Sequence, residues 1–242
     1  AGDSRNTAGN SDMVVWRYNS DGTLDTTFGG SGYVVHRSAA GADGFDYGRG
    51  LAIDGNGRIL VSGSSYNEAG DSDMVVWRYN SNGSLDTSFG GSGYIVHNDA
   101  AGGNSYDSGN DIAIDTNGKI LVAGYSRNAD GNHDMVVWRY NADGSLDTSF
   151  GSGGFFVHGN AAGGDDYDMA NGITIDSNER ILVTGYSSNI SGNYDMVVWR
   201  CNPDGTLDTS FDDDGYAVQG IATGGHLHDE GHDIGIDRGG KI

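Results

Sequence analysis

The loop before each copy of a repeated hexapeptide carries oxygen-bearing side chains at regular spacing. In the third copy, Asn128, Asp130, Asn132 and Asp134 stand two residues apart. Calcium-binding loops assemble hard oxygen ligands with this alternation, so the spacing predicts a Ca²⁺ site. The alternative is a turn in which an Asn side chain caps the backbone and holds no metal.

A second acidic turn, Asn-x-Asp-Gly-x-x-Asp, follows an Arg in each repeat and resembles the later part of the calcium loop of integrin-type propellers. Its candidate ligands are Asp21, Asp25, Asp143, Asp147, Asp204 and Asp208, and Asn82 replaces the first Asp in one copy. An Arg fills the place of the loop's first ligand, and a cation there opposes metal binding. The alternative is an Asx turn with an ion pair that joins Arg17, Arg78, Arg139 and Arg200 to Asp25, Asp86, Asp147 and Asp208.

A third pattern suits a sugar, which offers a C–H face to an aromatic ring and hydroxyls to a carboxylate. An aromatic residue followed by Asp recurs in a loop after the last strand of each repeat. The pairs are Phe45-Asp46, Tyr106-Asp107 and Tyr167-Asp168, with His228-Asp229 in the fourth copy. The alternative is that each ring packs inward and each Asp caps a turn.

The fourth copy also gathers histidines. His226, His228 and His232, with Asp229, could hold a transition metal, although the spacing matches no known metal signature. Motifs for catalysis are missing: the sequence has no Gly-x-Ser-x-Gly elbow, phosphate loop or His-Glu-x-x-His pair. We therefore expect no enzyme, and a hydrolase or lyase is the least favoured alternative.

The elements that position these residues come from an internal repeat. The string Asp-Met-Val-Val-Trp-Arg begins at Asp12, Asp73, Asp134 and Asp195, always 61 residues apart. We interpret residues 1–242 as a single repeat domain. Its units are residues 12–72, 73–133, 134–194, and 195–242 completed by 1–11.

Each repeat predicts four short strands. In the third copy they cover residues 111–115, 119–124, 134–140 and 155–158, with an Asn-Gly hairpin between the first two. Four-stranded antiparallel sheets that stack around an axis form a β-propeller, so an all-β propeller of four blades is expected. A larger propeller or an open array is the alternative. One Trp per repeat in the third strand predicts packing between blades.

Two runs carry a family resemblance: Asn-Gly-Lys-Ile-Leu-Val-Ala-Gly at residues 117–124, and Arg-Tyr-Asn-Ala-Asp-Gly-Ser-Leu-Asp-Thr-Ser-Phe-Gly at residues 139–151. They resemble the bacterial delta-60 repeat and, more distantly, NHL-type blades. The resemblance implies a propeller of bacterial proteins, often at the cell surface or secreted. It implies an architecture and no defined activity.

The composition argues against several classes of function. The 242 residues include 34 acidic and 13 basic ones, for a net charge of −21, which argues against nucleic acid as a partner. The sequence has no apolar run long enough to span a membrane. Cys201 is the single cysteine, so an internal disulfide cannot form. The start at Ala1 suggests a processed or excised piece. We expect a non-enzymatic extracellular propeller with a structural, adhesive or assembly role, and glycans or copies of itself as partners. A lectin-like carbohydrate-binding module is the alternative.

Overall fold

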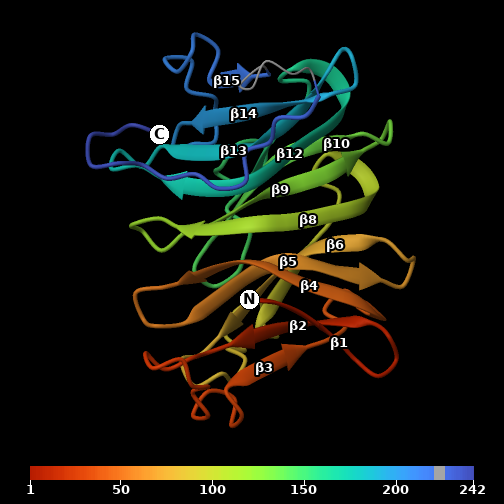
Figure 1. Ribbon diagram of the computed structural model, residues 1–242, viewed down its shortest axis with the longest axis vertical. Helices are drawn as coiled ribbons and strands as arrows, with labels where there is room; N and C mark the ends of the chain where they lie inside the picture. The colour runs from red at the N-terminus through yellow and green to blue at the C-terminus, as the bar shows by residue number, and fades with distance from the viewer. Residues whose placement is uncertain (221–226) are drawn as a thin grey trace.

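The computed structural model describes residues 1–220 and 227–242, and it contains strands and turns (Figure 1). The first sheet contains β1 (Gly2–Arg5), β2 (Ser11–Trp16) and β3 (Tyr33–His36). The second contains β4 (Gly41–Ile53), β5 (Ile59–Asn67), β6 (Ser72–Tyr79) and β7 (Tyr94–His97). The third contains β8 (Gly102–Ile114), β9 (Ile120–Asn128), β10 (His133–Tyr140) and β11 (Phe155–His158). The fourth contains β12 (Gly163–Ile175), β13 (Ile181–Asn189), β14 (Tyr194–Cys201) and β15 (Tyr216–Gln219).

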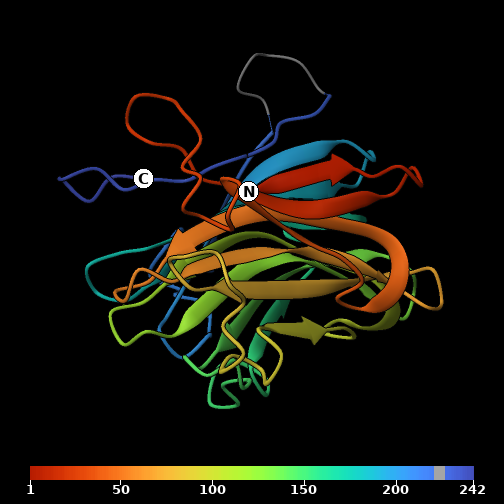
Figure 2. The same ribbon diagram turned by 90° about the horizontal axis from the view of Figure 1, so that it is seen from below.

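Strands within each sheet pair antiparallel in chain order, which is the blade topology of a β-propeller. A parallel pair, His133 with Tyr167, joins the third sheet to the fourth. Figure 2 views the stack from below and shows each sheet turned relative to the one before it. The expectation of an all-β propeller built from repeated blades is therefore confirmed.

Closure of the blades into one ring stays a prediction. Figure 1 places the first and fourth sheets at opposite ends of the long axis. In the part of the chain that the structure describes, β1 pairs with β2 and with no residue of the segment 227–242. None of the described residues forms a helix long and apolar enough to cross a membrane.

The core lies between successive sheets. Three clusters of buried side chains fill the spaces between the first and second, second and third, and third and fourth sheets. Trp77, Trp138 and Trp199 are fully buried in these clusters. The predicted role of the repeated Trp in packing one blade on the next is thereby confirmed for these three.

The first strands of the second, third and fourth sheets are longer than expected, and this corrects one prediction. β8 begins at Gly102 because its polar first half pairs with the end of β9, Gly102 opposite Asn128 and Asp107 opposite Ser126. Gly, Asn and Ser have low β propensity, so local sequence did not indicate this half. The aromatic–Asp pairs of the first three copies consequently lie in strands β4, β8 and β12 and not in a loop.

Candidate functional site

Six aromatic rings form a continuous row on the third and fourth sheets, which we call the aromatic band. The rings lie at the end of each sheet where the first strand begins, the second strand ends and the third strand begins. They belong to β9, β10, β12, β13, β14 and the segment after β15. The members of the band are Tyr125, His133, Tyr167, Tyr186, Tyr194 and His228.

Consecutive rings of the band are in contact. The His133 ring lies 5.0 Å from both the Tyr125 ring and the Tyr167 ring, measured between centroids. The Tyr194 ring lies 6.1 Å from the Tyr167 ring, 4.7 Å from Tyr186 and 4.5 Å from His228. The Tyr194 amide also donates a hydrogen bond to His228 Nδ1 at 3.1 Å. The row therefore crosses from one sheet to the next without a break.

The electrostatics of the band favour the uncharged form of four of its rings. Burial raises the pKa of Tyr125, Tyr186 and Tyr194 above that of a free tyrosine. Burial lowers the pKa of His133, and the nearby Arg127 guanidinium lowers it further. Tyr125, Tyr186, Tyr194 and His133 are therefore uncharged at neutral pH, and the band presents half-buried and exposed rings.

Carboxylates border this surface. Asp166 and Glu230 are exposed, and their negative charges help to raise the pKa of the Tyr194 hydroxyl. Glu230 acts on Tyr186 in the same way. The border therefore offers hydrogen-bond acceptors and repels anions.

The residues predicted to bind carbohydrate separate into rings and carboxylates. Tyr167 and His228 belong to the band. Phe45 stacks on Tyr47 at 6.1 Å, and Arg127 lies over Tyr106 at 5.7 Å from the ring centre. The Asp side chains of the first three pairs, Asp46, Asp107 and Asp168, are buried.

Two of these buried carboxylates serve the turn before the first strand of their sheet, whereas neither carboxylate oxygen of Asp107 has a hydrogen-bond partner among the described residues. Asp46 Oδ2 accepts a hydrogen bond from the Ser38 amide at 2.9 Å, and Asp168 Oδ2 accepts one from the Asn160 amide at 2.8 Å. In the fourth copy, the Asp229 amide donates to the Tyr194 carbonyl at 2.8 Å. The rings, and not the carboxylates, are thus placed to meet a ligand.

Four members of the band, Tyr125, His133, Tyr186 and Tyr194, were not predicted from the sequence. A signal for them existed in the differences between nearly identical copies. The second repeat has Ser64 where the later repeats have Tyr125 and Tyr186. Likewise it has Ser72 where they have His133 and Tyr194.

The expected Arg–Asp ion pairs are present in the acidic turns. Nε of Arg17, Arg78, Arg139 and Arg200 lies 2.8–2.9 Å from Oδ2 of Asp25, Asp86, Asp147 and Asp208. The other carboxylate oxygens of these turns accept from Ser or Thr hydroxyls two residues later, including those of Asp21, Asp143 and Asp204. Each Arg also covers a Phe ring, at 4.5–4.7 Å from the ring centre.

The loop predicted to bind calcium in the third copy forms a capped turn. Asn128 Oδ1 accepts hydrogen bonds from the Asp130 and Asn132 amides at 3.1 and 3.0 Å, and its Nδ2 donates to Asp134. Burial raises the pKa of Asp134. Calcium binding at this loop and at the acidic turns stays a prediction.

The predicted histidine cluster is only partly described. His226 lies outside the described residues. His228 packs on Tyr194, and His232 is exposed with Nε2 4.0 Å from Glu230 Oε2. Across residues 1–220 and 227–242, no three His, Cys, Asp or Glu side chains are grouped so that they could hold a metal ion.

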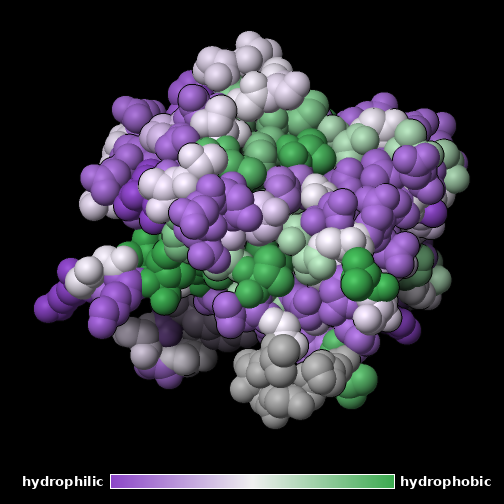
Figure 3. All heavy atoms as spheres, turned by 90° about the horizontal axis from the view of Figure 1, so that it is seen from above, coloured by the Kyte–Doolittle hydropathy of each residue, from purple (hydrophilic) through white to green (hydrophobic). Residues whose placement is uncertain are grey.

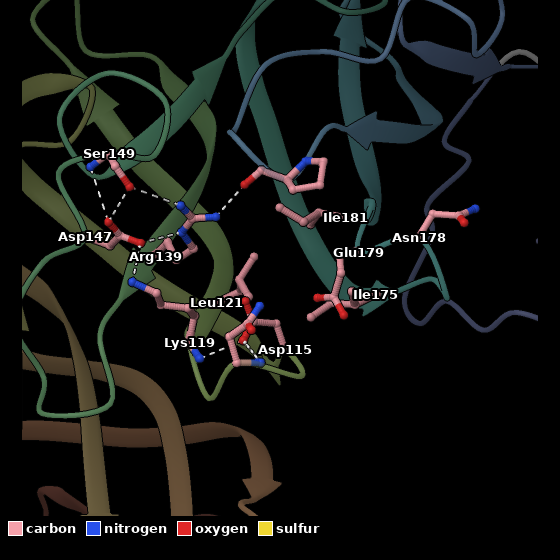
Figure 4. Close-up of a pocket in the computed structure, with 12 residues that line it drawn as sticks. Asp115, Lys119, Leu121, Arg139, Asp147, Ser149, Ile175, Asn178, Glu179 and Ile181 are labelled. Atoms are coloured by element: carbon pink, nitrogen blue, oxygen red, sulfur yellow. Dashed lines mark hydrogen bonds and ion pairs between the residues drawn. The ribbon is translucent and has the colours of Figure 1, made fainter.

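A cleft of about 420 Å³ lies at the opposite end of the third and fourth sheets (Figure 4). Lys119 and Arg139 both point to the Asp147 carboxylate, at 2.9 Å each. Arg139 also donates to the Pro203 carbonyl of the next sheet. These three charged groups are therefore paired with one another, and Arg139 also links the third sheet to the fourth repeat.

A match to a family model agrees with the repeat architecture. A family model described as "Domain of unknown function (DUF5122) beta-propeller" matches residues 1–28, 55–89, 116–150 and 177–211. A search of curated proteins found no match. Among solved structures, the chain is similar to a fucose lectin from Kordia zhangzhouensis in complex with methyl-fucoside, with 14% identity and a TM-score of 0.40. That similarity covers 69% of this chain and 94% of the lectin.

Proposed function

The chain belongs to the DUF5122 β-propeller family, and from that premise we propose that it is a non-enzymatic binding module which recognises neutral carbohydrate through the aromatic band. The observation that carries this proposal is the unbroken row of six rings, from Tyr125 to His228, along the end of two sheets. Uncharged aromatic faces suit the C–H face of a sugar ring.

The position of the band among the repeats supports a binding role. A purely structural residue would be expected to recur at the same place in every repeat, as the buried Trp does. Four of the six band members instead occupy positions where the second repeat has Ser64 and Ser72 and the later repeats have Tyr or His. Aromatic side chains are thus added to one end of the later sheets without a matching change in the core.

The border of the band supports a neutral ligand. Asp166 and Glu230 can accept hydrogen bonds from sugar hydroxyls. Their charges, together with a net charge of −21, would repel uronic or sialic acids. We therefore propose neutral hexoses or deoxyhexoses as the ligand class.

A glycan array with a matched pair of variants tests this function. Tyr167 and Tyr106 occupy equivalent positions and are 39% and 37% exposed, but only Tyr167 belongs to the band. We expect Tyr167→Ala to weaken binding about tenfold, close to one aromatic contact, and Tyr106→Ala to leave it unchanged. An array on which the wild-type chain binds no neutral glycan would overturn the proposal. Equal losses of glycan binding in both variants would show that the ligand binds outside the aromatic band.

A structural, adhesive or assembly role at a bacterial surface is the second candidate. It is favoured by the near identity of the repeats and by the resemblance to the delta-60 repeat, which often occurs in surface or secreted proteins. An extracellular location belongs to this proposal. Localisation of the native protein by cell fractionation tests it, and recovery only from the cytoplasm would contradict it.

A further inference from the structure

The aromatic band consists of two equivalent groups of three rings, placed one repeat apart. The members of the second group follow those of the first by 61 residues. The first group is Tyr125, His133 and Tyr167, and the second is Tyr186, Tyr194 and His228. The repeat of the sequence has therefore produced a repeat of the binding surface.

The two groups have nearly the same geometry. In the first group, the His133 ring lies 5.0 Å from each of the other two rings. In the second, the Tyr194 ring lies 4.7 Å and 4.5 Å from the other two. A parallel backbone pair holds each group together, His133 with Tyr167 and Tyr194 with His228. Because the backbone fixes both groups, little conformational freedom is lost when they bind a ligand.

The two groups join into a surface that is longer than one sugar. The Tyr167 ring of the first group lies 6.1 Å from the Tyr194 ring of the second. A pyranose ring has about the width of a Tyr ring, so one monosaccharide can stack on only one or two members of the band. Covering both groups requires a chain of several sugars.

The rings keep area for a ligand along the whole row. His228 is exposed and Tyr167 is 39% exposed, while Tyr125, His133 and Tyr194 are half-buried. Among the described residues, no member of the band belongs to the three core clusters between the sheets. Packing of the core therefore does not account for these rings.

Hydrogen-bonding side chains accompany both groups. Arg127 lies directly opposite His133 where β9 pairs with β10. Asp166 and Glu230 are exposed beside the second group, and their charges act on the Tyr194 hydroxyl. A guanidinium donates to sugar oxygens, and a carboxylate accepts from sugar hydroxyls. Partners for hydroxyls are thus present at more than one position along the row.

The surrounding surface suits a sugar chain better than an apolar ligand. Figure 3 views the molecule from the end at which the fourth sheet lies and shows apolar side chains between polar ones. A lipid or an apolar protein face would need a continuous apolar patch. A sugar chain carries both C–H faces and hydroxyls, so it fits aromatic rings that are bordered by polar groups.

We propose that the two groups of rings together bind one linear, neutral oligosaccharide with a repeating unit, and that each group takes one segment of the chain. This inference rests on the carbohydrate-binding function proposed above and specifies the form of its ligand. Once one group holds a segment, the next segment meets the other group at a high effective concentration. Affinity therefore rises with chain length until both groups are covered.

Titration calorimetry with oligosaccharides of increasing length tests this inference. The probes are cello-, manno-, malto- and acetylated chito-oligosaccharides, each from one to six units. In the series that binds best, we expect the hexamer to bind at least about tenfold more tightly than the monomer. Equal affinities for monomer and hexamer, or no binding in any series, would overturn the inference. If the glycan array still shows binding of neutral monosaccharides, the proposed function stands; if it shows no neutral glycan, both fail.

A matched set of variants tests whether both groups take part. Tyr106, Tyr167 and His228 occupy equivalent positions in successive repeats, and all three are exposed, so their loss should leave the fold intact. Tyr167→Ala and His228→Ala should each weaken hexamer binding about tenfold. Each should change monomer affinity by less than about twofold, because the other group remains. Tyr106→Ala, outside the band, should bind both probes like the wild type. Loss of hexamer binding in only one of the two band variants would confine the ligand to one group and overturn the inference.

Discussion

At the scale of single residues, Asp107 is unusual because it is fully buried and its carboxylate oxygens have no hydrogen-bond partner among the described residues. Burial raises its pKa from 3.8 to about 7, and the charges of Asp73 and Asp99 add to the effect. The folded chain therefore holds a proton on Asp107 that the unfolded chain loses near its ordinary pKa. The stability from this group is full below about pH 4 and is lost as the pH rises through about 7.

We predict that Asp107→Asn removes this group's loss of folding stability with rising pH. Between about pH 5 and about pH 8 the wild-type midpoint of urea unfolding should fall, and that of Asp107→Asn should fall less. Asp168→Asn is the matched comparison, because burial raises the pKa of Asp168 only to about 6 and its effect should be complete at lower pH. Asp147, whose pKa is lowered by its Ser149, Lys119 and Arg139 partners, titrates below this window. Identical pH profiles for wild type and Asp107→Asn would contradict the prediction.

At the scale of elements, the interface between sheets depends on one Trp from each. Trp138 is fully buried against the second sheet, so Trp138→Ala should leave a cavity and lower the free energy of unfolding by about 3–5 kcal/mol. Trp16→Ala is the matched control, since the same ring is 38% exposed in the first sheet. Denaturant unfolding of dilute protein should show a clearly smaller loss for Trp16→Ala. Equal losses would mean that the first sheet is covered in solution even when dilute.

Prediction from the sequence succeeded for some strands and failed for others. The fourth strand of the third repeat was predicted at residues 155–158 and is β11, Phe155–His158, because its apolar run is short and bounded by Gly-rich turns. The first half of β8 was missed, since its Gly, Asn and Ser residues are held by pairing with β9 and not by their own propensity. The aromatic band was missed for a different reason. Its rings meet only after strands of different repeats are brought together, as with His133 and Tyr167.

At the scale of the whole molecule, the main feature is the excess of negative over positive charge. The chain has 34 acidic and 13 basic residues, and some of the basic ones are committed to ion pairs in the acidic turns. Much of the negative charge therefore faces solvent without a protein cation. Monovalent salt screens such charge over about 8 Å at physiological strength, whatever the cation. A specifically bound divalent ion adds stability by binding the folded state in preference to the unfolded one.

We therefore predict that calcium raises the melting temperature more than sodium at matched ionic strength. The loop from Asn128 to Asp134 is the place to test, because it has the fullest alternation of oxygen side chains. Asp130→Ala should reduce the extra effect of calcium, because Asp130 is exposed and its side chain is free to turn toward an ion. Asp213→Ala, at an exposed acid outside these loops, should leave it unchanged. Equal shifts of the melting temperature with calcium and with sodium would show that the effect is charge screening alone. Equal calcium effects in both variants would place the bound ion at another loop.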